Sequence, residues 1–168
     1  MIKFLRLTFL TLASMLIISC SSNDDEIEYD YLPVKLVGSE MWSILNVQTG
    51  EVVFRDEFKN EPSAIYNEVF LVKDDKGTFD YYNVNDVKKP VNKTSYYMAA
   101  DFVGSDIVPA TLPGKQITLI NNKCEEVAVL DKSIERCAKF VEGLAPFMDD
   151  NDKWGFLDKT GKIIIKAK

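Results

Sequence analysis

A five-residue pattern recurs along this chain at nearly constant spacing, and it limits the possible folds more than any other feature. Each copy begins with an aromatic or branched apolar residue and ends with Asn or Asp at the fifth place. The copies are Trp42–Asn46, Phe79–Asn83, Ile117–Asn121 and Trp154–Asp158, so their first residues lie 37, 38 and 37 positions apart. A period of this length indicates a repeat architecture in which each unit buries its apolar side against its neighbours.

The residues around each copy predict short antiparallel strands. An apolar run precedes each copy, a polar turn follows it, and apolar residues come after the turn, starting at Val52, Val91, Val127 and Ile163. Asn or Asp suits such a turn because its side chain can bond to nearby backbone. We therefore expect an all-β chain of about four antiparallel three-stranded meanders in a propeller-like or solenoid-like array. The units span 31–57, 58–97, 98–134 and 135–168. A closed ring, an open array and an irregular sheet are all compatible with them.

The last unit carries the most regular copy. Phe140 opens the segment FVEGLA, and residues 153–162 read KWGFLDKTGK. Gly161 is expected to supply a positive φ in a tight turn, and Gly155 to permit close strand packing beside Trp154. The two linked motifs resemble the WG repeat family, in sequence and in separation. The resemblance implies a structural role for the signature residues, which are Phe140, Gly143, Trp154, Gly155, Asp158, Gly161 and, at the matching place in the first unit, Trp42.

The first 20 residues form a separate pattern. Lys3 and Arg6 precede an apolar run over 7–18, which is shorter than the about 20 residues that a membrane-spanning helix needs. A basic start followed by a short apolar centre is typical of a secretory signal. The run ends in IISC at Cys20, which resembles the lipobox of bacterial lipoproteins. That resemblance implies that residues 1–19 are a cleaved signal peptide and that lipid on Cys20 anchors the protein to a membrane.

The segment that follows Cys20 indicates which membrane face the protein occupies. Residues 20–30 are small, polar and acidic, so we expect a flexible tether that joins the anchor to a β-repeat domain over 31–168. The run SNDDE at 22–26 resembles the export signal of surface lipoproteins in Bacteroidetes. The expected location is therefore the outer membrane with the domain exposed at the cell surface, and the periplasmic face is the alternative.

Charge and composition exclude several classes of function. Loss of residues 1–19 removes two basic residues and no acid, which takes the formal net charge from −6 to −8. An acidic chain is a poor partner for nucleic acid, whose phosphates need Lys and Arg. The sequence holds no histidine, which rules out Ser-His-Asp and Cys-His catalysis and histidine metal sites. We expect no enzymatic activity, no cofactor and no metal.

Two local features have both a specific and a plain structural explanation. The run Asp149–Asp152 could offer oxygen ligands to Ca²⁺, but it lacks the spacing of a calcium loop and lies where a turn is expected. Cys124 and Cys137 could form a disulfide, which needs Cβ atoms about 3.8 Å apart. The plainer prediction for them is two half-buried thiols.

Aromatic residues gather in adjacent pairs and at the repeat positions. Those that could stack on sugar rings are Trp42, Trp154, Tyr81, Tyr82, Tyr96 and Tyr97. Adjacent residues of a strand face opposite sides, so at most one tyrosine of each pair should be displayed. The two tryptophans share one repeat position, which favours a packing role for both.

These features together favour a binding or interaction module, held at the cell envelope by lipid, that contacts protein or glycan. The alternatives are an accessory structural subunit of an envelope complex and a glycan-binding surface lipoprotein. An enzyme with paired carboxylates, as in glycoside hydrolysis, would need two acids converging in a cleft. The many acids of this sequence are not distinguished from ordinary turn residues.

Overall fold

The computed structural model describes residues 29–168. The predicted signal peptide, Cys20 and all but the end of the predicted tether lie outside the described residues. Within residues 29–168 the chain forms strands and turns, and it contains no helix able to cross a membrane.

The strands form four antiparallel sheets in which each strand pairs with its neighbour in sequence. The first sheet holds β1 (Tyr31–Lys35), β2 (Trp42–Asn46) and β3 (Val52–Phe58), and the second holds β4 (Val69–Lys73) and β5 (Phe79–Asn83). The third holds β6 (Met98–Ala99), β7 (Ile107–Thr111), β8 (Ile117–Asn121) and β9 (Glu126–Val129). The fourth holds β10 (Ile134–Cys137), β11 (Leu144–Asp149), β12 (Trp154–Asp158) and β13 (Ile163–Ile165). The predicted all-β array of small antiparallel sheets is confirmed.

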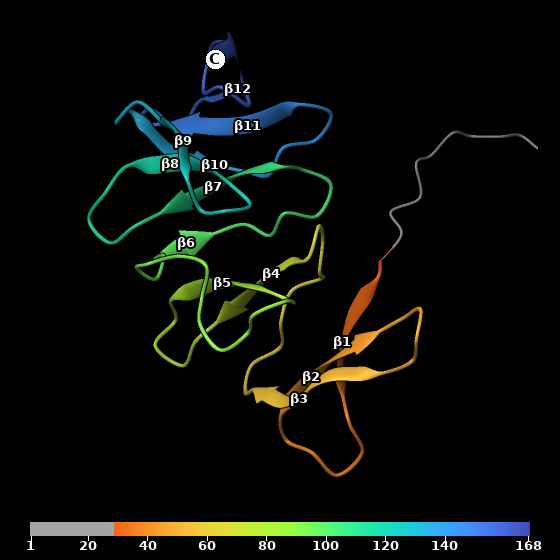
Figure 1. The fold of residues 1–168 in the computed structure, drawn as a ribbon. Helices are drawn as coiled ribbons and strands as arrows, with labels where there is room; N and C mark the ends of the chain where they lie inside the picture. The colour runs from red at the N-terminus through yellow and green to blue at the C-terminus, as the bar shows by residue number, and fades with distance from the viewer. Residues whose placement is uncertain (1–28) are drawn as a thin grey trace, which may run out of the picture.

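The sheets follow one another in sequence order from one end of the molecule to the other (Figure 1). The first and fourth sheets lie at opposite ends, so the described part of the chain is an open array. The four copies of the recurring pattern coincide with β2, β5, β8 and β12, and each of these strands pairs with the strand just before it.

The fifth residue of each copy acts as predicted. Its side-chain oxygen accepts hydrogen bonds from backbone N–H groups of the turn that follows, at 2.8–3.1 Å. These acceptors are Asn46, Asn83, Asn121 and Asp158. The turn that ends each central strand is therefore built by a local side chain as well as by backbone.

The sequence predicts three strands in every unit, but only the first sheet has three. The four sheets have three, two, four and four strands, and Val91 does not begin a strand. Instead the Val91 N–H donates to the Tyr81 carbonyl at 2.7 Å, and Asn92 Oδ1 accepts from the Tyr81 N–H at 2.8 Å. One backbone bond and one carboxamide side chain therefore stand in for the pairing that a third strand would supply, and Pro90 just before them offers no N–H to a ladder.

The core consists of three apolar clusters, and each cluster fills the space between two consecutive sheets. The first cluster lies between the first and second sheets, the second between the second and third, and the third between the third and fourth. Each cluster contains the third residue of one copy of the recurring pattern. It also contains a residue from the strand that precedes the next copy. These pairs are Ile44 with Phe70, Tyr81 with Val108, and Leu119 with Ala145. Full burial of a large apolar side chain contributes about 1.5–3 kcal/mol, so stability resides chiefly between the sheets.

Candidate functional site

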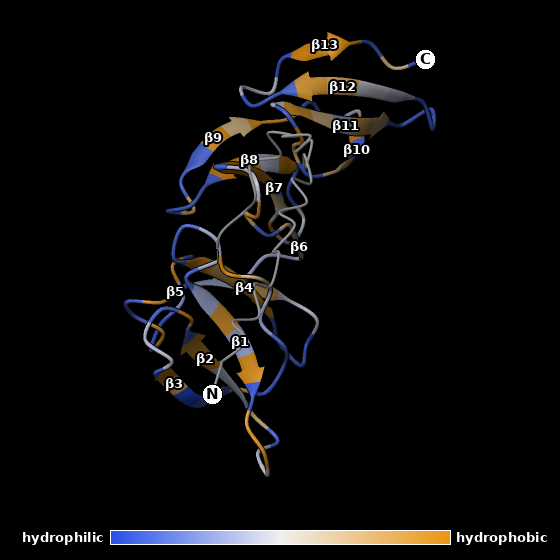
Figure 2. Ribbon diagram, turned by 90° about the vertical axis from the view of Figure 1, so that its right-hand side faces the viewer, coloured by the Kyte–Doolittle hydropathy of each residue, from blue (hydrophilic) through white to orange (hydrophobic). Residues whose placement is uncertain are grey.

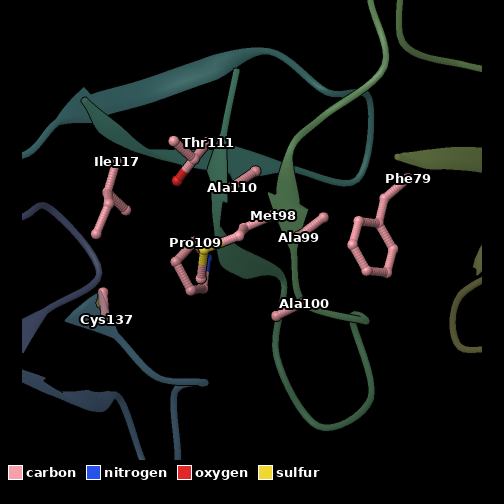
Figure 3. Close-up of a pocket in the computed structure, with 9 residues that line it drawn as sticks. All are labelled: Phe79, Met98, Ala99, Ala100, Pro109, Ala110, Thr111, Ile117 and Cys137. Carbon is pink, nitrogen blue, oxygen red and sulfur yellow. The ribbon is translucent and has the colours of Figure 1, made fainter. Parts of the chain in front are cut away.

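An apolar hollow lies where the second, third and fourth sheets approach one another (Figure 3). Its volume is about 210 Å³. We call it the central groove and define it by its lining residues, which are Phe79, Met98, Ala99, Ala100, Pro109, Ala110, Thr111, Ile117 and Cys137. The lining comes from β5, β6, β7, β8 and β10, so stacking of consecutive units creates the groove.

Strand pairing holds the centre of this groove in place. β6 pairs with β7 through Met98 opposite Thr111 and Ala99 opposite Ala110. On the other side, Phe79 and Tyr96 exchange two backbone hydrogen bonds of 2.9 Å, which tie the chain just before β6 to the second sheet. The short strand β6 is thus fixed from both sides, and Met98 remains 48% exposed.

The groove offers few polar groups. Only the Thr111 hydroxyl and the Cys137 thiol interrupt its apolar side chains. Burial raises the pKa of the Cys137 thiol to about 12, so the sulfur is protonated at neutral pH and is a poor nucleophile. The groove is suited to hold an apolar group without reacting with it.

A second hollow of about 510 Å³ adjoins the central groove and shares Met98, Thr111 and Ile117 with it. Tyr97, which is 63% exposed, contributes an aromatic ring there. Besides Thr111, this hollow is lined by the polar side chains of Lys115, Gln116, Lys132 and Glu135. Together the two hollows form an apolar site with an aromatic and charged mouth.

The adjacent tyrosines alternate as the sequence predicts. Tyr81 and Tyr96 are buried in the second cluster, at 0% and 6% exposed, whereas Tyr97 is displayed. The Tyr81 hydroxyl donates to the Ala100 carbonyl at 2.6 Å, and burial raises its pKa. Tyr82 lies half-buried against the first sheet. Tyr97 is therefore the tyrosine of these pairs that is available to a ligand.

The two tryptophans differ, although they share a repeat position. Trp42 is half-buried and packs against the first cluster, as expected. Trp154 is 51% exposed, so the described chain does not cover it as it covers Trp42. The physical reason is position, because the face that carries Trp42 meets the second sheet whereas the face that carries Trp154 meets no described sheet.

The two cysteines are free thiols and pack against different clusters. Cys124 lies beside the second cluster, and burial raises the pKa of its thiol to about 12. Cys137 lies beside the third cluster and lines the central groove. The plainer of the two predictions, half-buried thiols, describes both.

The acidic run in the fourth unit forms the turn between β11 and β12. Asp149 Oδ1 accepts the N–H groups of Asn151 and Lys153 at 2.9 and 3.0 Å. The Asn151 side chain donates to Asp150. Among residues 29–168, no group of three or more Cys, Asp or Glu side chains is placed to hold a metal ion.

The remaining signature residues lie in the turns and in the core of the fourth unit. Phe140 is buried in the third cluster at 3% exposed. Gly143 and Gly161 both have φ of 82°. A Cβ on Gly155 would lie 2.5 Å from the Ile165 carbonyl oxygen and 2.7 Å from the Phe147 ring. These four residues therefore serve the backbone conformation and the packing of the fold.

Sequence reasoning missed a second copy of the turn before β11. Glu142 and Gly143 have positive φ there, and Asn67 and Glu68 have φ of 48° and 63° at the matching place before β4. The preceding apolar residue is buried in both, as Phe140 and as Ile65. The signal in the sequence is the spacing of 75 residues between these two apolar residues, about twice the repeat period.

The fold and site define an all-β repeat array with an apolar groove across its middle. No protein-family model matches the chain, and neither does any curated protein. It is similar to a solved structure, the computationally designed Ika8 protein, with a TM-score of 0.52 and 9% identity over 85% of this chain. The chain covers 47% of the designed protein, about half its length. At this identity the similarity concerns the fold alone.

Proposed function

We propose that this protein is a lipid-anchored module of the cell envelope that binds an apolar segment of a partner protein in the central groove. The groove itself carries the proposal. Its walls are apolar, and Met98 and Tyr97 stand 48% and 63% exposed at its mouth. Concave sites with a mostly apolar lining and a few polar groups are the usual form of ligand pockets. An unbranched Met side chain adapts to partners of varied shape.

The envelope location rests on the amino-acid sequence. Cys20 closes a lipobox-like IISC, and the acidic run at 22–26 resembles a surface export signal. More than one acyl chain is needed for stable anchoring, and lipobox cysteines normally carry two or three. The groove is thereby held near a membrane surface, where its partner would be another envelope protein.

Glycan binding is the second candidate, and the mouth of the groove favours it. Tyr97 offers an exposed ring for stacking beside Lys115 and Gln116, which offer hydrogen-bond donors. An accessory structural subunit without a ligand of its own is the third. Such a subunit would leave both hollows empty when assembled.

Site-specific photo-crosslinking in intact cells tests the proposal. A photoreactive amino acid at Met98 of the full-length chain should form an adduct with an envelope protein. The same probe at Val37, which is 107% exposed in the β1–β2 loop, is the matched control and should form none. Equal labelling at both places, or none at Met98, would contradict partner binding in the groove.

A second experiment distinguishes glycan binding from binding of a partner protein. A glycan array probed with the full-length protein should show binding that Tyr97→Ala abolishes if sugars occupy the mouth of the groove. Binding that survives this change would rule out the stacking role of Tyr97.

A further inference from the structure

Each sheet has two faces that differ regularly along the array. The front face carries the third residue of the recurring pattern, and the rear face carries the fourth. The third residues are Ile44, Tyr81, Leu119 and Phe156. Across the ladder from the fourth residue, on the same rear face, stands a residue of the preceding strand, and these residues are Leu32, Phe70, Val108 and Ala145.

Front faces are covered wherever a next sheet exists. Ile44, Tyr81 and Leu119 are each 0% exposed, and each belongs to the cluster that its sheet shares with the next one. At the same position in the fourth sheet, Phe156 is 38% exposed, and Trp154 beside it on that face is 51% exposed. Figure 2 shows this hydrophobic end of the array, with β12 and β13 outermost.

Rear faces follow the opposite rule. Phe70, Val108 and Ala145 are 1%, 0% and 0% exposed because the preceding sheet covers them. In the first sheet, Leu32 is 40% exposed at the same position. Its cross-strand partner Leu45 is half-buried. In the described array, the front face of the fourth sheet and the rear face of the first sheet are therefore left uncovered. Inside the molecule, every front face packs on the rear face of the next sheet.

We infer that a second copy of this chain docks here, with the rear face of its first sheet on the front face of the fourth sheet. The contact repeats the three internal interfaces. Phe156 and Leu32 would meet as Ile44 meets Phe70 between the first two sheets. Side chains that are uncovered in one copy would thereby become buried, as large apolar patches on soluble proteins generally are.

Charge disfavours docking of two first sheets on each other. Residues 30–58, which carry the first sheet, contain five acids and two basic residues. Residues 134–168, which carry all four strands of the fourth sheet, contain seven basic residues and six acids, and five of those basic residues lie in 153–168. An acidic sheet therefore meets a slightly basic one in front-on-rear docking, whereas two acidic sheets repel each other in rear-on-rear docking.

Such a contact uses different surfaces on the two partners, so it either closes into a ring or continues as a chain.

Engineered cysteines test this docking in the full-length chain. Two differently tagged forms are co-expressed, one with Phe156→Cys and the other with Leu32→Cys, and are then mildly oxidised. We expect a disulfide-linked species that contains both tags. Pairs with Phe156→Cys on both forms, or with Val37→Cys replacing Leu32→Cys, are the controls and should give at most a tenth of that yield. Equal yields in all pairs, or no linked species, would overturn the inference.

Sedimentation of the detergent-solubilised full-length protein gives an independent readout. The unmodified chain should sediment as two or more copies at about 100 µM. Phe156→Asp should shift it to a single copy with an unchanged circular dichroism spectrum. A single copy before any substitution would also overturn the inference.

Discussion

At the scale of single residues, Gly155 shows most clearly how one position can depend on its neighbours. It occupies the second place of the recurring pattern, where the other copies have Ser43, Asp80 and Thr118. The Phe147 ring lies over Gly155 and leaves no room for a side chain. The glycine is therefore required for packing, because its φ is not in the left-handed region that favours glycine.

The substitution Gly155→Ala should lower the free energy of unfolding by about 1–3 kcal/mol, the usual cost of overpacking a core. The new methyl group would meet the Ile165 carbonyl at 2.5 Å and the Phe147 ring at 2.7 Å. Chemical denaturation measures the loss. Adding Phe147→Leu should cost less in this background than in the unmodified protein, because a smaller side chain makes room. Equal costs of Phe147→Leu in both backgrounds would contradict this account.

At the scale of elements, the turns are built by carboxylates and carboxamides at the strand ends. Asp158 accepts the N–H groups of Thr160 and Lys162 at 2.9 and 3.1 Å, and Thr160 Oγ1 donates to the same oxygen at 2.6 Å. The Thr160 hydroxyl makes the largest contribution to holding the pKa of Asp158 below its ordinary value of 3.8. The turn after β12 is therefore more stable when Asp158 is ionised.

This lowered pKa predicts a dependence of stability on pH. A carboxyl whose pKa is lower in the folded state stabilises the fold above its ordinary pKa, and that contribution is lost as the pH falls through the folded-state pKa. The melting temperature should therefore decrease when the pH is lowered below about 4. The substitution Asp158→Asn keeps the acceptor oxygen and cannot titrate, so its melting temperature should fall less. Melts between pH 7 and pH 2.5 compare the two proteins, and superimposable pH profiles would exclude the Asp158 contribution.

At the scale of the whole molecule, four small sheets are stable because they stack. A two-stranded sheet such as β4–β5 is marginal alone in water, yet both of its faces are covered here. Its front face meets the third sheet and its rear face meets the first. The same stacking creates the central groove from three units and leaves one apolar face uncovered at each end.

The predicted anchor at Cys20 would hold this array at a membrane. Unmodified protein should remain in the membrane fraction, and Cys20→Ser should move it to the soluble fraction because the thiol that would accept the lipid is lost. Protease added to intact cells should degrade the unmodified form. Immunoblots of fractions and of shaved cells measure both results. Full protection from protease would refute surface display and favour the periplasmic face.

The strands and their turns could be predicted from the sequence because their causes are local. Apolar residues at the first, third and fourth places, followed by Asn or Asp at the fifth, mark β2, β5, β8 and β12 at their observed bounds. The turn side chains bond to backbone only two to four residues away. The all-β class and the number of units follow from that recurrence alone.

Only the tertiary structure decided which of these residues are covered. Trp42 and Trp154 share a pattern position, yet Trp42 is half-buried against the core and Trp154 is half exposed, because burial depends on whether another sheet follows. The central groove likewise joins side chains from three units, Phe79, Met98 and Cys137 among them, that no local pattern connects. The sequence by itself determined the strands and turns, since residues close in the chain make them. The faces, the groove and the uncovered ends depend on contacts between distant residues.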